Sequence, residues 1–307
     1  MLSMIRKRLS DWRWERMIQR TRSRLPYVEG LRYIDYLEKA RRAGGVVPSP
    51  LDRIAAAATA YGTEGYSIFH PSDASGLAAR MRDRVSKLAE AAGETAWQDD
   101  RFTAGDVYRD FPEIRELLAG ELGAFYRAAF GAHFKIFYGT IFRSIRRQED
   151  AINSQIWHAD GGPGTCIISA IALTDIGAHN GGTEVLPWSR SVDLMREERR
   201  NAAMLSERKR KFGEKATKLQ LRSVICEFYA ESIERAYRES IVQASGPPGT
   251  IFSFSNNLIH RGGHPMPGQE RMVAMLHVYP SCEPTPFERY ARDGIPKTAG
   301  MPAGPDF

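Results

Sequence analysis

The chain has 307 residues, of which 42% are hydrophobic and 26% charged, and its formal net charge is +6. This composition allows a buried core and excludes a wholly disordered chain, and no apolar run reaches the roughly 20 residues of a membrane-spanning helix. The three cysteines have no zinc-ligand spacing, and their odd number argues against a disulfide scaffold in a chain this long, so we expect a reducing, cytoplasmic location.

The excess positive charge lies at the N-terminus. Residues 1–45 carry 12 Lys/Arg against 5 Asp/Glu, whereas the rest of the chain carries 31 against 32. Within residues 1–25, Ile5, Leu9 and two tryptophans lie among arginines, which predicts a basic amphipathic helix. One interpretation is a helix docked on the domain by its apolar stripe, and the other is peripheral contact with a membrane or an acidic partner. A transit peptide is a third interpretation, against which the acidic residues of the segment count.

Residues 1–132 are predicted to be mostly helical and to pack on the rest of the chain. An Ala-rich run covers 51–61, and a second helix is expected over 74–92, where apolar residues recur every three or four positions. Its start is marked by Pro71-Ser72-Asp73. A third helix is expected over 112–130, ended by Gly131.

From residue 133 the pattern changes to short strands separated by Gly, Pro and Asn turns. Many short strands of this kind predict a β-sandwich or barrel, so the fold class is α+β. We expect residues 133–307 to form the core, in one structural domain with the helical region before it. The expected strands cover 133–145, 166–173, 183–186, 241–244, 250–254 and 271–279.

A charged segment, residues 195–238, interrupts these strands and is predicted to be a helical insertion. Its stretch 196–222 holds 10 Lys/Arg against 4 Glu. One interpretation is a pair of solvated surface helices. The other is a basic lid that receives an anionic substrate.

The main chemical signal is the tetrapeptide Trp157-His158-Ala159-Asp160. In a strand, residues i and i+2 point to the same face, so the imidazole and the carboxylate can hold one cation. A second histidine, His260, ends a predicted strand and completes a two-histidine, one-carboxylate set that leaves metal positions open. His264 and His277 compete as the third ligand, but one lies beside a proline and the other within the closing strand.

Arg271 follows His260 by 11 residues and begins the strand that closes the series. A hairpin of that length would return Arg271 alongside the metal, where its guanidinium would pair with the distal carboxylate of a metal-bound keto acid. A surface ion pair is the alternative role. Between the ligand segments, residues 180–191 are predicted to form a turn, a strand and a loop.

The order His-x-Asp, Gly-Gly-x-x-x-Leu-Pro-x-Ser, His and Arg resembles the phytanoyl-CoA dioxygenase family, over about residues 134–190 and 241–282. The resemblance implies a double-stranded β-helix core, of the jelly-roll or cupin-like type. It also implies Fe(II) as metal, with 2-oxoglutarate and O₂ as co-substrates. The N-terminal helices and the insertion match only in general layout.

Carried over by residue, the resemblance implies that His158, Asp160 and His260 bind iron and that Arg271 binds the 2-oxoglutarate carboxylate. The presence of the aspartate argues against a halogenase. Two positions depart from the family pattern. Trp188 stands where glycine is usual, and Gly262 stands where a hydroxyl residue often contacts 2-oxoglutarate, so we expect that contact from the first core strand. The candidates on that strand are Thr140 and Tyr138.

The expected function is hydroxylation of an unactivated C–H bond of a small molecule, with release of succinate and CO₂. An anionic or carrier-linked substrate would suit the basic segments. Desaturation or ring closure are alternative reactions. The sequence leaves the oligomeric state open. A non-catalytic metal- or ligand-binding β-helix is a second interpretation. A nucleic-acid demethylase is disfavoured, and no nucleic-acid partner is expected, because the core is neutral. Candidate substrate contacts are Gln155, Trp157, Glu184 and Trp188.

Overall fold

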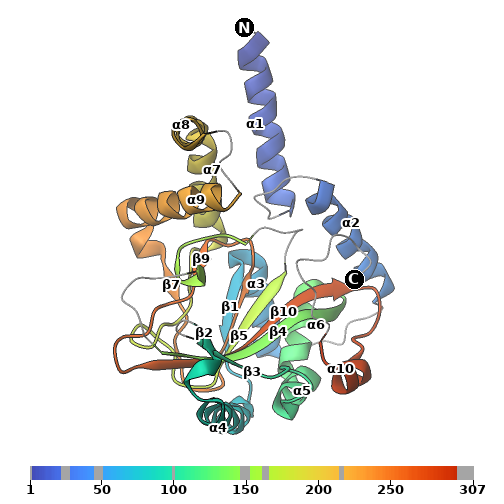
Figure 1. The fold of residues 1–307 in the computed structure, drawn as a ribbon. Helices are drawn as coiled ribbons and strands as arrows, with labels where there is room; N and C mark the ends of the chain where they lie inside the picture. Colours follow the sequence, from blue (N-terminus) through green and yellow to red (C-terminus); the bar gives the residue numbers. More distant parts are fainter. Residues whose placement is uncertain are drawn as a thin grey trace.

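Two antiparallel sheets form the centre of the protein in a computed structural model (Figure 1). The larger sheet has the strand order β1-β8-β5-β10-β4-β3-β2, and the smaller has the order β7-β6-β9. The structure describes residues 2–21, 28–44, 51–98, 101–145, 153–160, 166–213 and 218–295. The strands are β1 (Tyr66–Phe69), β2 (Trp97–Gln98), β3 (Arg101–Ala104), β4 (His133–Ile145), β5 (Ile167–Ala172), β6 (Glu184–Val185), β7 (Val242–Gln243), β8 (Ile251–Ser255), β9 (His260–Arg261) and β10 (Glu270–Ser281).

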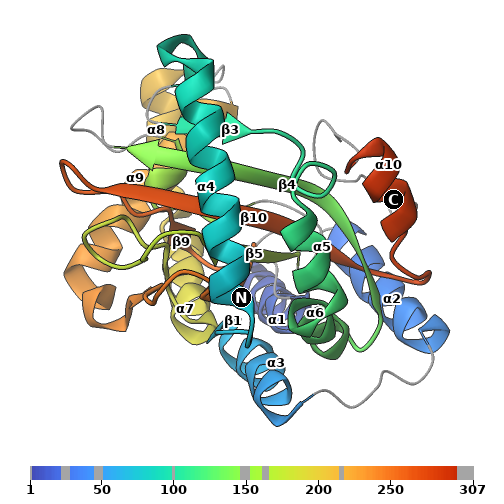
Figure 2. The same cartoon turned by 90° about the horizontal axis from the view of Figure 1, so that it is seen from below.

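Helices from the N-terminal region cover one face of the larger sheet. Figure 2 shows α4 lying across β4 and β10, with α5 and α6 beside it. The predicted helical insertion lies between β6 and β7 as three helices, followed by a π-helical turn at Ile233–Tyr237. The helices are α1 (Leu2–Thr21), α2 (Val28–Ala43), α3 (Asp52–Glu64), α4 (Ala74–Ala92), α5 (Pro112–Ala119), α6 (Glu121–Phe130), α7 (Trp188–Arg200), α8 (Ala202–Phe212), α9 (Lys218–Ser232) and α10 (Phe287–Asp293).

The two faces of β10 separate the core from the site, because side chains alternate along a strand. Met272, Leu276 and Val278 are buried in the core cluster that also holds apolar residues of α3 to α6. Arg271 and His277 belong to the opposite face, which looks toward the smaller sheet. The α+β jelly-roll core with N-terminal helices and a helical insertion is therefore confirmed.

Several boundaries differ from the sequence prediction for local reasons. The helix expected over 112–130 is two helices, because Gly120 leaves the helical region with φ −92° and ψ −136°. The loop expected at the end of residues 180–191 is shorter than predicted, since α7 already begins at Trp188, directly after Pro187. The short strands β1, β2 and β3 were not predicted. Their two to four residues are too few to show a periodic pattern.

The N-terminal helix α1 packs on α7 of the insertion. Its Trp14 and Ile18 are buried in a cluster with Trp188 and Val192, and Arg196 donates two hydrogen bonds of 2.7 Å to Glu15. The docked interpretation of this helix therefore describes its C-terminal half, while its N-terminal end stands clear of the sheets (Figure 1). Among the described helices, none has the length and hydropathy needed to cross a membrane. Peripheral membrane contact stays a prediction.

Candidate active site

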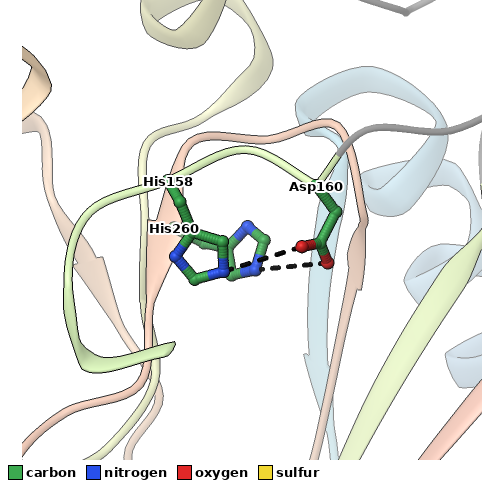
Figure 3. Close-up of side chains that lie close together, drawn as sticks. All are labelled: His158, Asp160 and His260. Atoms are coloured by element: carbon green, nitrogen blue, oxygen red, sulfur yellow. Dashed lines mark ion pairs between the residues drawn. The ribbon is translucent and has the colours of Figure 1, made fainter. Parts of the chain in front are cut away.

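Backbone pairing brings the three predicted metal ligands together (Figure 3). His158 and His260 form an isolated antiparallel bridge, in which the backbone N and O atoms lie 2.9 and 2.8 Å apart in the two directions. The backbone of Asp160 donates to the carbonyl of Asn256 at 3.0 Å. One ligand atom from each of the three side chains lies within 4.8 Å of the others. The carboxylate oxygens are 3.7 Å from His158 Nε2 and 3.8 Å from His260 Nε2.

Each imidazole is oriented by a backbone carbonyl two residues earlier in the chain. His158 Nδ1 lies 2.6 Å from Ile156 O, and His260 Nδ1 lies 2.8 Å from Leu258 O. A carbonyl accepts only from N–H, so both rings carry the proton on Nδ1 and present the Nε2 lone pair toward Asp160. Two neutral imidazoles and one carboxylate suit iron with open coordination positions. The residues present therefore fit the implied metal.

Arg271 is buried in β10 of the larger sheet. Its side chain is only 5% exposed, and Nη1 donates to the carbonyl of Gly181 at 2.5 Å. Its Nε is buried without a hydrogen-bond partner among the described residues. Burial, and to a smaller extent the charge of Arg101, lowers the pKa of Arg271 to about 10. The guanidinium is thus still charged at neutral pH.

The segment between His260 and Arg271 does not form the predicted hairpin. His260 lies in β9 of the smaller sheet, whereas Arg271 lies in β10 of the larger one, so the chain crosses between sheets. The contact is made by Gly262, where a Cβ would lie 3.4 Å from Arg271 Nη2. Its backbone N–H donates to Ser154 O at 2.7 Å. The crossing places Arg271 beside Gly262, which is two residues after the metal-ligand candidate His260.

The Gly-Gly motif has a separate structural purpose. Gly181 has φ +76°, and a Cβ there would lie 2.6 Å from the carbonyl oxygen of Gly263. A Cβ on Gly263 would in turn lie 2.5 Å from Gly181 C. Only glycine at both positions permits this backbone contact. This backbone contact places the Gly181 carbonyl where Arg271 Nη1 can donate to it.

A second arginine on this face was not predicted. Arg101 in β3 is paired with Ser144 in β4, and Ser144 is paired with Arg271 in β10, so the three form one row across the sheet. The Arg101 Cζ lies 4.2 Å from the centre of the Phe142 ring, and the Arg271 Cζ lies 5.5 Å from it. Burial lowers the pKa of Arg101. No sequence motif marks this arginine, because its position depends on the pairing of a four-residue strand.

The remaining cofactor candidates lie further along β4. Thr140 is buried opposite Met275, and Tyr138 is 45% exposed opposite His277. His277 packs edge-on against Tyr138, with ring centres 5.1 Å apart. Burial lowers the pKa of His277 to about 4, with Asp160 opposing and His260 reinforcing that shift, so this imidazole is neutral and near the three ligands. Within the described part of the chain it does not join the metal-ligand group.

The substrate candidates occupy different surroundings. Glu184 forms an ion pair of 2.5 Å with Arg261 and accepts a hydrogen bond from Gln243 at 3.0 Å. Trp157 is buried beneath the guanidinium of Arg261, which lies 4.7 Å from its ring centre. Both therefore support the strand that carries His260. Gln155 is half-buried at the end of a short 3-10 helix, and Trp188 is buried in the hydrophobic cluster under α1.

Comparison with known proteins agrees with this geometry. Residues 143–273 match the family model for phytanoyl-CoA dioxygenase (PhyH), which spans the three ligands and Arg271. No curated protein matches the chain. The match confirms the family resemblance and the enzyme class, a 2-oxoglutarate-dependent dioxygenase that uses iron and O₂.

Two solved structures share the fold at low sequence identity. The epimerase SnoN, in complex with Fe3+, alpha ketoglutarate and nogalamycin RO, aligns with a TM-score of 0.51 and 15% identity, over 75% of this chain and 84% of SnoN. EctD from S. alaskensis with bound Fe aligns with a TM-score of 0.50 and 19% identity, over 84% of this chain and 91% of EctD.

Proposed function

Because the chain is similar to phytanoyl-CoA dioxygenase over its core, we propose that it hydroxylates an unactivated C–H bond of a small-molecule substrate. His158, Asp160 and His260 hold Fe(II), and Arg271 holds the distal carboxylate of 2-oxoglutarate. The observation that carries this proposal is a convergent His-Asp-His group together with a buried arginine that lies against Gly262, two residues after His260.

The protein's contribution is orientation and exclusion of water. Iron with 2-oxoglutarate and O₂ supplies the oxidising chemistry when bound, with succinate and CO₂ as co-products. The Nδ1–H groups of His158 and His260 fix both rings, so the two Nε2 lone pairs and the Asp160 carboxylate would converge on a metal ion without reorganisation. Arg271, charged and buried, sets the direction in which a dicarboxylate lies on the sheet.

In this proposal the substrate binds against the end of the sheet face that holds Tyr138 and His277. Tyr138 is exposed, and Phe137 and Tyr138 both pack edge-on against His277. A neutral imidazole between two aromatic rings suits a ligand with an apolar or ring portion and one polar group. Free small metabolites fit this description better than a polynucleotide, which needs a basic groove.

The test is the visible absorption spectrum of the protein with Fe(II) and 2-oxoglutarate in the absence of oxygen. A keto acid chelated to Fe(II) gives a metal-to-ligand charge-transfer band, and we expect it in the wild type. Succinate release across a panel of metabolites then identifies the substrate. Fe(II) binding without the band would instead support a non-catalytic metal-binding protein.

A further inference from the structure

The site lacks a hydroxyl at the position where the family resemblance leads one to expect it. The second residue after His260 is Gly262, and a Cβ there would lie 3.4 Å from Arg271 Nη2 and 3.6 Å from Nη1. A serine at this position would therefore place its hydroxyl beside the guanidinium that receives the carboxylate. In this chain position 262 offers no side chain for that contact.

Ser154 approaches the same place from a different segment. Its carbonyl accepts the Gly262 N–H at 2.7 Å, and its hydroxyl accepts from Arg101 Nη2 at 3.5 Å. Ser154 therefore connects the backbone in front of Arg271 with the second arginine. The long hydroxyl contact leaves Arg101 with weak restraint from this partner.

Arg101 and Arg271 form an unusual pair of charges. Both guanidiniums lie against the ring of Phe142, and each originates beside Ser144 in the cross-strand row. Within the part of the chain that the structure describes, neither forms an ion pair with a carboxylate. The charge of Arg101 contributes to the lowered pKa of Arg271. Two like charges in a poorly solvated place repel each other, and a bound anion removes that repulsion.

We propose that Arg101, which lies beside Ser154, takes the place of the missing hydroxyl at position 262 and binds the distal carboxylate of 2-oxoglutarate together with Arg271. This inference rests on the proposed function. It also replaces the expectation that Thr140 or Tyr138 makes the contact. Those residues lie four and six positions along β4 from Ser144, opposite Met275 and His277, whereas Arg101 starts in the same row as Arg271.

The experiment measures the dissociation constant of 2-oxoglutarate from the charge-transfer band of the Fe(II) protein without oxygen. Arg101→Gln should raise that constant about ten- to hundredfold, since a hydrogen bond to a charged group is lost. Ser154→Ala should raise it a few-fold, because Arg101 loses its support. Arg143→Gln is the matched control, as Arg143 lies on β4 and pairs with Glu270 at 2.7 Å. It should leave the constant unchanged.

Two further measurements separate a binding role from a general structural one. The probe 2-oxopentanoate has a methyl group in place of the distal carboxylate, so Arg101→Gln should not change its affinity. Gly262→Ser added to Ser154→Ala should restore most of the lost affinity for 2-oxoglutarate, because it returns the hydroxyl to the guanidinium. The melting temperature of each variant, measured without ligand, shows that the fold is intact.

The possible failures are distinguishable. A wild-type protein that forms no band with 2-oxoglutarate would overturn the proposed function itself. A normal band in the wild type, with the same dissociation constant in Arg101→Gln, would overturn only the inference and leave Arg101 for an anionic group of the primary substrate. Equal weakening of 2-oxopentanoate would also overturn it, because Arg101 would then act on the fold or on the metal end.

Discussion

The arginines of the helical insertion and the arginines of the site differ in their partners. On the surface, Arg196 pairs with Glu15 and Arg199 pairs with Asp11, while Arg208 pairs with a glutamate of α9. On the sheet face, Arg101 and Arg271 have no carboxylate partner among the described residues. Part of the dense positive charge that the sequence shows is therefore paired with carboxylates within the fold. The two arginines without such a partner on the sheet face lie in the core, whose overall charge balance is neutral.

The energies of the two groups explain this difference. Exposed ion pairs contribute only about 0 to 1 kcal/mol each, so the surface arginines can be paired or unpaired at little cost. A buried charge without a counter-charge costs several kcal/mol. Two such charges on one face are therefore a stronger indication of an anion site than ten on the surface. The predictions that follow test each side of this contrast.

The largest effect is expected from removing the carboxylate that faces the two imidazoles. Asp160→Ala should weaken Fe(II) binding by more than about 100-fold, beyond the effect of losing an outer-shell partner, and should abolish the charge-transfer band. Equilibrium titration with Fe(II) measures this loss. Asp193→Ala removes a surface carboxylate that pairs with Arg196 and serves as the control, with unchanged metal affinity. Retained iron binding in Asp160→Ala would remove this residue from the ligand set.

The second-largest effect is expected from replacing Arg271, the more deeply buried of the two arginines. Arg271→Gln should raise the dissociation constant of 2-oxoglutarate by about 30-fold to several thousand-fold, as expected for truncating one partner of a buried charge pair. Fe(II) affinity should stay the same, because the side chain binds no metal. An affinity for 2-oxoglutarate equal to that of the wild type would place the carboxylate elsewhere.

An intermediate effect is expected from pH, through the neutral histidine of the same face. The folded pKa of His277 is about 4, below the ordinary value of about 6.5, so between these values the unfolded chain binds more protons. The free energy of unfolding of the metal-free protein should therefore fall as pH drops from 6.5 to 4, by at most about 3 kcal/mol from this group. Denaturant titrations at several pH values measure it. His277→Gln should flatten the dependence, and an unchanged slope would contradict the buried neutral form.

The smallest effect is expected on the paired surface. Arg196→Ala should lower the free energy of unfolding by about 0.2 to 1 kcal/mol, since its partners Glu15 and Asp193 are both partly exposed. The affinity for 2-oxoglutarate should be unaffected. A clear loss of that affinity would show that the insertion takes part in binding, as the lid interpretation requires.

The elements predicted with the right bounds are those whose pattern lies within one continuous segment of the sequence. The helix over 74–92 and the strand over 133–145 have the predicted bounds, because long periodic runs define their own ends. His158 and Asp160 were recognised from their spacing. Their convergence with His260 then follows from one backbone bridge.

What the sequence did not reveal depends on pairing between distant segments. Arg101 reaches the site because β3 pairs with β4, and nothing within its four residues predicts that register. Ser154 joins the same place through a hydrogen bond to Gly262, more than 100 positions later. The partners of Glu184 were hidden in the same way, since Arg261 and Gln243 come from two other strands.

The backbone contact between Gly181 and Gly263 has a consequence for variation among related sequences. Neither residue offers a side chain to a ligand, yet an alanine at either position would force the two loops apart and withdraw a carbonyl from Arg271. In a library of random substitutions, these two positions should be as intolerant as the metal ligands themselves. The exposed positions 206, 207 and 209–211 of α8 should accept almost any residue.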